Sequence, residues 1–158
     1  MKIDHIDLTI LATLQDKGRI KRNRLAEKVS LSIPSISERL RKMEEVGLIR
    51  SYHALLEPRH LGLLVTAFIF VVSESSKFYQ KIIERAQKDH EILECHAITG
   101  DGSHLLKVRT QSTDTLEKLL SRIQSWPGVV RTRTDIVLSS PKESTALPLQ
   151  HLREEKQE

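Results

Sequence analysis

The sequence lacks the residues that disulfides, cysteine-rich metal sites and membrane spans require. It has a single cysteine, Cys95, among 158 residues, which excludes an internal disulfide and any metal site built from several cysteines. Its longest apolar run, residues 61–72, is interrupted by a glycine and a threonine and falls short of the ~20 residues that cross a bilayer. Residues 1–5 carry an acid and no apolar signal-peptide core. We therefore expect a cytoplasmic protein with no membrane partner.

The sequence also lacks the residue groupings of common enzymes. It offers no clustered acids, no nucleophile–base pair and no set of metal ligands. Cys95 and His96 are neighbours in an expected strand, so their side chains point to opposite faces and suit neither a metal site nor a catalytic pair. Gly100 and Gly102 lie in an expected hairpin with no helix after it, which disfavours a nucleotide-binding cradle. We predict no catalytic residue, no metal site and no cofactor.

The length and composition are those of a small folded protein. Hydrophobic residues make up 39% and charged residues 29% of the chain, which favours a globular rather than a disordered protein. A chain of this length forms one ordinary domain or two small ones. Because small domains bury little surface by themselves, two such domains would depend on an oligomer.

Positive charge is concentrated near the N-terminus. The whole chain has a net charge of +4, yet residues 16–42 hold nine basic and three acidic residues, an excess of six positive charges. Such a patch suits a nucleic-acid phosphate backbone. From charge alone, a merely solvated surface is an equally good interpretation.

Apolar spacing in this region predicts three helices. Ile6, Ile10 and Leu14 recur at helical spacing over residues 4–15, and a shorter helix is expected over residues 22–29. Ser32 is a suitable N-cap for a third helix, and Pro34 falls in its first turn, where its missing N–H has no cost. This helix should end near Gly47.

Two short helices joined by a tight turn, the second rich in Arg and Lys, are typical of a helix-turn-helix. Arginine and lysine can bind phosphates or base edges, and serine can do either. The alternative is a solvated helix face. The residues that we predict to contact double-stranded DNA are Arg22, Ser32, Pro34, Ser35, Glu38, Arg39, Arg41 and Lys42.

Beyond Pro58 the pattern becomes that of an α+β domain. Strands are expected over residues 63–72, 92–99, 104–110 and 129–138, with helices after the first and third strands. This is the βαββαβ order of ferredoxin-like domains. A further strand is expected over residues 48–56. The domains expected are a helix-turn-helix over residues 1–57, a linker over 58–62, a second domain over 63–140 and a loose tail over 141–158. A short final helix is expected within the tail.

Several stretches in this order and spacing resemble the Lrp/AsnC, or feast/famine, family. They lie in residues 4–20, 31–49, 52–58, 94–101, 105–108 and 127–134. The resemblance implies a transcriptional regulator with a winged helix-turn-helix and a βαββαβ effector-binding (RAM) domain. It also implies homodimers that often assemble into octamers, and a small effector, typically an amino acid, bound near the Gly100-Asp101 turn.

The turn departs from the family pattern. An aromatic residue and a second aspartate usually follow Gly-Asp, whereas Gly102 and Ser103 stand here, and the turn between the second and third helices has Ser30 where a glycine is usual. A ligand-independent, nucleoid-type DNA organiser is therefore the alternative function. If an effector binds, we expect Asp101 to bind its ammonium group and the N–H groups of the turn to bind its carboxylate. We expect His104 to contact its side chain. The candidate effector-binding residues are Thr99, Gly100, Asp101, Gly102, Ser103 and His104.

Overall fold

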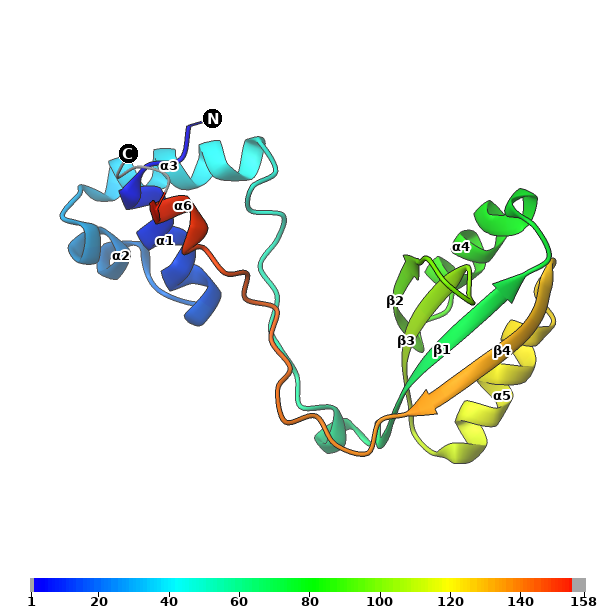
Figure 1. Cartoon of the computed structure of the whole chain (residues 1–158). Coiled ribbons are helices and arrows are strands. Elements are labelled where there is room, and N and C mark those ends of the chain that lie inside the picture. The colour runs from blue at the N-terminus through cyan, green and yellow to red at the C-terminus, as the bar shows by residue number, and fades with distance from the viewer. Residues whose placement is uncertain (1, 155–158) are drawn as a thin grey trace. The chain divides into compact units, whose positions relative to one another are not determined.

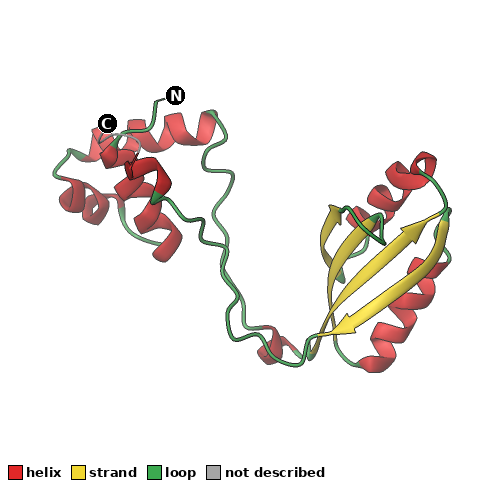
Figure 2. Ribbon diagram, viewed as in Figure 1, coloured by secondary structure: helices red, strands yellow, loops and turns green. Residues whose placement is uncertain are grey.

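The computed structural model describes residues 2–154, which divide into two compact units (Figure 1). The first unit combines residues 1–55 with residues 142–158, and the second spans residues 56–141. The first unit is helical, and the second contains the strands of the described chain (Figure 2). The α+β class predicted from the sequence is confirmed.

Three helices form the core of the first unit. They are α1 (His5–Asp16), α2 (Arg22–Val29) and α3 (Ile33–Glu45). Their bounds lie close to those predicted, because the spacing of apolar residues selects the face that each helix buries. The buried side chains where the three helices meet are those of Ile10, Leu25, Ala26, Ile36, Leu40 and Met43.

Local sequence signals set where α3 begins and how the turn before it is built. The Ser32 side chain accepts a hydrogen bond from the Ser35 N–H at 3.2 Å, and Pro34 lies in the first turn. The predicted N-cap is therefore present. Ser30, between α2 and α3, has a φ of 54°, a left-handed conformation in which glycine is more usual. The turn thus forms without the family glycine.

The strand predicted over residues 48–56 is not formed. Residues 48–49 form a bend and residues 50–56 have no regular secondary structure, and none of them pairs with a strand of the sheet. Tyr52, Leu55 and Leu56 are 50%, 79% and 68% exposed. A strand requires a second strand to form hydrogen bonds with its N–H and C=O groups. The alternation of apolar residues could not show that the described chain provides no such strand for residues 48–56.

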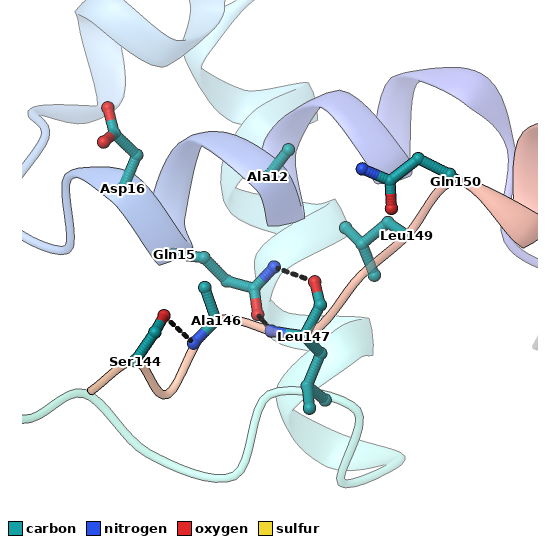
Figure 3. Close-up of a pocket in the computed structure, with 8 residues that line it drawn as sticks. All are labelled: Ala12, Gln15, Asp16, Ser144, Ala146, Leu147, Leu149 and Gln150. Atoms are coloured by element: carbon teal, nitrogen blue, oxygen red, sulfur yellow. Dashed lines mark hydrogen bonds between the residues drawn. The ribbon is translucent and has the colours of Figure 1, made fainter. Parts of the chain in front are cut away.

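The C-terminal segment also differs from the expectation of a loose tail. Residues 142–154 belong to the first unit, where the Gln15 side chain on α1 pairs with the backbone of Leu147. Gln15 Nε2 donates to the Leu147 carbonyl at 3.1 Å, and Gln15 Oε1 accepts the Leu147 N–H at 2.6 Å. Figure 3 shows this pairing beside a cavity of about 380 Å³. A short helix, α6 (His151–Glu154), follows as predicted.

The second unit is a four-stranded antiparallel sheet in the order β2-β3-β1-β4. Two helices lie on one side of it, as Figure 2 shows. The strands are β1 (Val65–Ser73), β2 (Ile92–Ala97), β3 (His104–Thr110) and β4 (Val129–Ile136), and the helices are α4 (Tyr79–Lys88) and α5 (Thr113–Gln124). The predicted βαββαβ order is confirmed.

The two faces of this sheet differ in burial. On the helix-covered face, Ile69 and Leu106 are completely buried against α4 and α5. On the other face, Phe68 and Phe70 of β1 are only partly buried, and Phe70 stands opposite Leu105 on β3 and Arg133 on β4. Successive side chains of a strand alternate between faces, so apolar residues of β1 line both sides of the sheet.

Candidate nucleic-acid interface and effector cavity

The outer face of α3 presents the polar residues that the sequence predicts for DNA contact. Pro34, Ser35, Glu38, Arg41 and Lys42 are all exposed. Ser35 is held at the helix start by the Ser32 hydroxyl, whose Oγ lies 2.8 Å from Ser35 Oγ. The structure therefore brings these residues together on one exposed surface, which we call the α3 outer face.

The cations of the α3 outer face are paired with acids on the same helix. Arg41 binds Glu38, with Nη2 2.7 Å from Oε1, and also binds Glu45. Lys42 Nζ lies 3.5 Å from the same Glu38 oxygen. The hydrogen bond from Arg41 lowers the pKa of Glu38. Because these pairs are exposed, they contribute little stability, so a phosphate or base edge could replace the acids.

Arg39 does not lie on the α3 outer face. Its Nη1 donates to Asp7 Oδ1 at 2.7 Å and to Asp4 Oδ2 at 2.8 Å, both at the start of α1. The Asp7 side chain is only 3% exposed and that of Arg39 29%. The structure thus places Arg39 between α3 and α1, and the DNA contact predicted for it from the sequence stays a prediction.

The charges of Arg39, Asp7 and Asp4 reinforce one another. The hydrogen bonds to Asp7 and Asp4 raise the pKa of Arg39. Burial alone would raise the pKa of Asp4, but the hydrogen bonds from the Asp7 N–H and from Arg39 outweigh burial and lower it. Lys2 lines a cavity of about 480 Å³ beside these side chains. The sequence pattern indicated neither Lys2 as a residue of this cavity nor the two aspartates as partners of Arg39.

Arg22 lies at the first residue of α2, near α3. Its side chain is exposed, and Nη1 donates to Ser37 Oγ at 3.3 Å. The remaining donors of its guanidinium face solvent-exposed surface at the beginning of a helix, where phosphates bind favourably. Arg22 therefore adds a cation beside the α3 outer face, from the second helix of the motif.

The turn between β2 and β3 contains Gly100 with a φ of +98°, as a tight turn requires. Gly102, in the same turn, does not have a positive φ. Ser103 is buried and donates both its N–H, at 2.9 Å, and its hydroxyl, at 3.1 Å, to the Val71 carbonyl oxygen. Because these donors are occupied, Ser103 does not offer the carboxylate-binding N–H predicted for it.

His104 points into the helix-covered core. It is completely buried, and its ring meets Tyr79 edge-on with 4.9 Å between the ring centroids. Nδ1 lies 3.0 Å from Ser103 Oγ, and the only proton of that hydroxyl is directed to Val71. Nε2 has no hydrogen-bond partner among the described residues, and burial lowers the pKa of the ring.

A cavity of about 520 Å³ lies beside the turn. Thr99, Asp101 and Gly102 of the turn line it, whereas Ser103 and His104 do not. The contact between His104 and a ligand expected from the sequence is therefore wrong for this cavity. We call this space the turn cavity.

The strands contribute residues to the turn cavity that the sequence did not single out. Val72 and Ile98 supply apolar walls, and Arg131 and Arg133 of β4 supply cations. The Arg133 guanidinium lies over the Phe70 ring, with Cζ 3.9 Å from the ring centroid. No periodicity could have linked β4 to the turn, because the strand order of the sheet brings them together.

Other candidate chemistry is not supported by the described residues. Among residues 2–154, no group of three or more His, Cys, Asp or Glu side chains could hold a metal ion. Burial raises the pKa of Cys95, which disfavours its thiolate. No helix of residues 2–154 is long and apolar enough to cross a membrane.

Comparison with protein families identifies both units. Residues 3–50 match a winged helix-turn-helix DNA-binding model, and residues 66–147 match the Lrp/AsnC ligand binding domain. The HTH-type transcriptional regulator FL11 of Pyrococcus horikoshii is 36% identical over 93% of this chain and 97% of its own length. The leucine-responsive regulatory protein of Escherichia coli K12 is 38% identical over 92% of this chain and 90% of its own length.

Solved structures agree over nearly the whole chain. A transcriptional regulator from Neisseria meningitidis, solved as its complex with L-methionine, is 33% identical, with a TM-score of 0.91 over 96% of this chain and 99% of that one. A feast or famine regulatory protein from M. tuberculosis, also complexed with L-methionine, is 29% identical, with a TM-score of 0.86 over 92% and 99%. Each of these relatives is a regulatory protein. The chain therefore belongs to the Lrp/AsnC family of DNA-binding transcriptional regulators.

Proposed function

We propose that this regulator responds to an amino acid or a similar small molecule bound in the turn cavity, which alters how its helix-turn-helix unit binds double-stranded DNA. The observation that carries this proposal is the turn cavity itself, which Asp101 lines and which lies in the domain matched by the Lrp/AsnC ligand-binding model. Two structural relatives hold L-methionine. Linkage then requires that effector and DNA each change the affinity for the other.

The DNA contacts proposed lie on the α3 outer face and at the start of α2. Arg41 and Lys42 supply cations, Ser32, Pro34 and Ser35 allow close approach of the helix start, and Glu38 orients Arg41. Arg22 binds phosphate. Arg39 positions α3 against α1 and contributes to binding through that contact, which revises the role expected from its sequence position.

The functional form proposed is a homodimer that assembles further, up to an octamer. The partly exposed Phe68 and Phe70 of the open sheet face, and the exposed Leu55 and Leu56 between the units, are apolar surface that a second copy would cover. Two recognition helices related by symmetry would then read two half-sites. Light scattering should show a dimer or a multiple of it at micromolar concentration, and a monomer would contradict this proposal.

The test of the proposed function measures DNA affinity with and without amino acids. Fluorescence anisotropy with the upstream region of the protein's own gene and with random DNA, at matched salt, gives the specificity ratio. Arg41→Ala should lower specific affinity by about 1–3 kcal/mol if it reads a base edge, and Arg22→Ala should weaken binding to both DNAs and reduce the salt slope by about 1. Lys118→Ala, an exposed site on α5, is the control.

A ligand-independent DNA organiser is the second candidate, and Ser103 is the observation that favours it. Its N–H and hydroxyl are occupied by Val71, so this turn offers a ligand fewer donors than an open loop would. Comparable affinity for specific and random DNA, unchanged by any of the twenty amino acids, would favour the organiser over the effector-responsive regulator.

A further inference from the structure

We infer that the turn cavity selects a net-anionic effector, an acidic α-amino acid, whose carboxylates are bound by Arg131 and Arg133 and whose ammonium group is bound by Asp101. This inference rests on the proposed function, because it names the class of ligand for the same cavity. It departs from the neutral L-methionine held by two structural relatives. The reason is the balance of charges that this chain places around the cavity.

The charged residues that line the turn cavity are two cations and one anion. Arg131 and Arg133 stand two residues apart on β4 and therefore project from the same face of the strand. Asp101 lines the cavity from the turn. A neutral amino acid has one carboxylate and one ammonium group, so its carboxylate would provide an anion for only one of the two arginines. An amino acid with two carboxylates matches all three side chains.

Within the described chain, Arg131 has no acidic partner and Arg133 has only a weak one. Arg131 makes no hydrogen bond or ion pair that involves another described residue. Arg133 faces Asp135, but Nη2 lies 3.5 Å from Oδ2 and both side chains are mostly exposed, so the pair is weak. Stacking over Phe70 holds the Arg133 guanidinium in place. Both cations are therefore available to carboxylates.

Part of the turn backbone is already hydrogen-bonded and offers no donor to a carboxylate. The Ser103 N–H binds Val71, and the Ile98 N–H binds the Ser103 carbonyl at 3.1 Å. The arginines offer forked donors that match carboxylate geometry. The apolar walls from Val72 and Ile98 are small, and Arg133 covers the Phe70 ring. A short methylene stem, as in glutamate or aspartate, suits these walls.

The experiment compares isosteric ligands that differ in charge. Isothermal titration calorimetry on the full-length oligomer would measure L-glutamate against L-glutamine, L-aspartate against L-asparagine, and L-methionine. We expect the better acidic ligand to bind about ten-fold more tightly or more than its amide, as expected for one additional hydrogen-bonded charge. Added salt should reduce the ratio, because salt screens exposed charges.

Two variants locate the source of this selectivity. Arg131→Gln should bring the acid and the amide to within about two-fold of one another, because one charge-assisted pair is lost. Lys118→Gln, on α5 and not among the cavity residues, removes the same charge and should leave the ratio unchanged. Circular dichroism at matched concentration verifies that both variants are folded.

The outcomes separate this inference from the proposed function. Tight binding of L-methionine or of an amide, equal to or above that of the acids, would overturn the acidic ligand while the effector-responsive regulator stands. An acid–amide ratio unaffected by Arg131→Gln would overturn the role of Arg131. If no amino acid binds wild type or changes its DNA affinity, both the inference and the proposed function fail.

Discussion

The Arg39 guanidinium on α3 donates to the Asp7 carboxylate on α1 at 2.7 Å, across 32 residues of sequence. Asp7 is almost completely buried, and its neighbour Asp4 binds the same guanidinium nitrogen. A buried carboxylate is costly unless it is paired and hydrogen-bonded. Arg39 therefore links α3 to α1.

Arg39→Ala should destabilise the helix-turn-helix unit, in addition to any loss of DNA affinity. Leaving the Asp7 carboxylate unpaired should lower the free energy of unfolding by about 1–3 kcal/mol, measured by urea denaturation. Asp7→Ala combined with Arg39→Ala should cost less than the two single changes added together, because the unpaired charge is gone. Unchanged stability together with lost specific binding would instead return Arg39 to a base-reading role.

His104 should make the stability of the second unit depend on pH. Burial lowers its pKa below the ordinary value of 6.5, so the unfolded chain binds a proton more readily than the folded one at mildly acidic pH. Stability should therefore be constant above about pH 7, fall as the pH drops below 6.5, and level off below the folded pKa.

The variant His104→Phe isolates this effect from the other histidines. It retains the aromatic contact with Tyr79 but cannot titrate, so its urea midpoint should change less than that of wild type between about pH 7.5 and 5.5. An equal pH dependence in both proteins would show that the proton is taken up elsewhere.

Gly128 should tolerate no side chain. It has a φ of +80°, and a Cβ there would lie 2.1 Å from the Phe78 Cγ atom. Gly128→Ala should cost roughly 2–4 kcal/mol from backbone strain and overpacking together. Gly62, with a φ of +74° and open space around it, is the matched control in the same unit, and Gly62→Ala should cost about 1–2 kcal/mol. Equal losses in thermal denaturation would exclude the Phe78 clash.

Gln15 should protect the C-terminal segment from proteolysis. Its side-chain amide holds the Leu147 backbone by two hydrogen bonds, so Gln15→Ala should speed tryptic cleavage after Lys142. The global stability should fall by less than about 1 kcal/mol, because both bonds are exposed. Gln15→Glu keeps the acceptor for the Leu147 N–H and loses the donor, so it should be intermediate. Identical cleavage rates for the three proteins would rule out this attachment.

Much of the fold follows from the sequence because its signals are local. Three signals for α3 act within a few residues of one another: the Ser32 cap, Pro34 in the first turn and the amphipathic spacing. In the second unit, changes in periodicity predict the order of strands and helices. The exposed residues of the α3 outer face were likewise found from the helical spacing alone.

The tertiary structure decided the contacts that join distant parts of the chain. Helical spacing places Arg39 on the flank of α3. Its hydrogen bond to Asp7 forms only because α3 packs on α1. Gln15 meets Leu147 across 132 residues, and Arg131 reaches the turn cavity through the strand order. The alternation of side chains along β3 indicates which residues share a face with His104. Only the position of α4 shows that this face is buried. Helical and strand periodicity reports which face a residue occupies, whereas its partners depend on packing between elements, which no local pattern encodes.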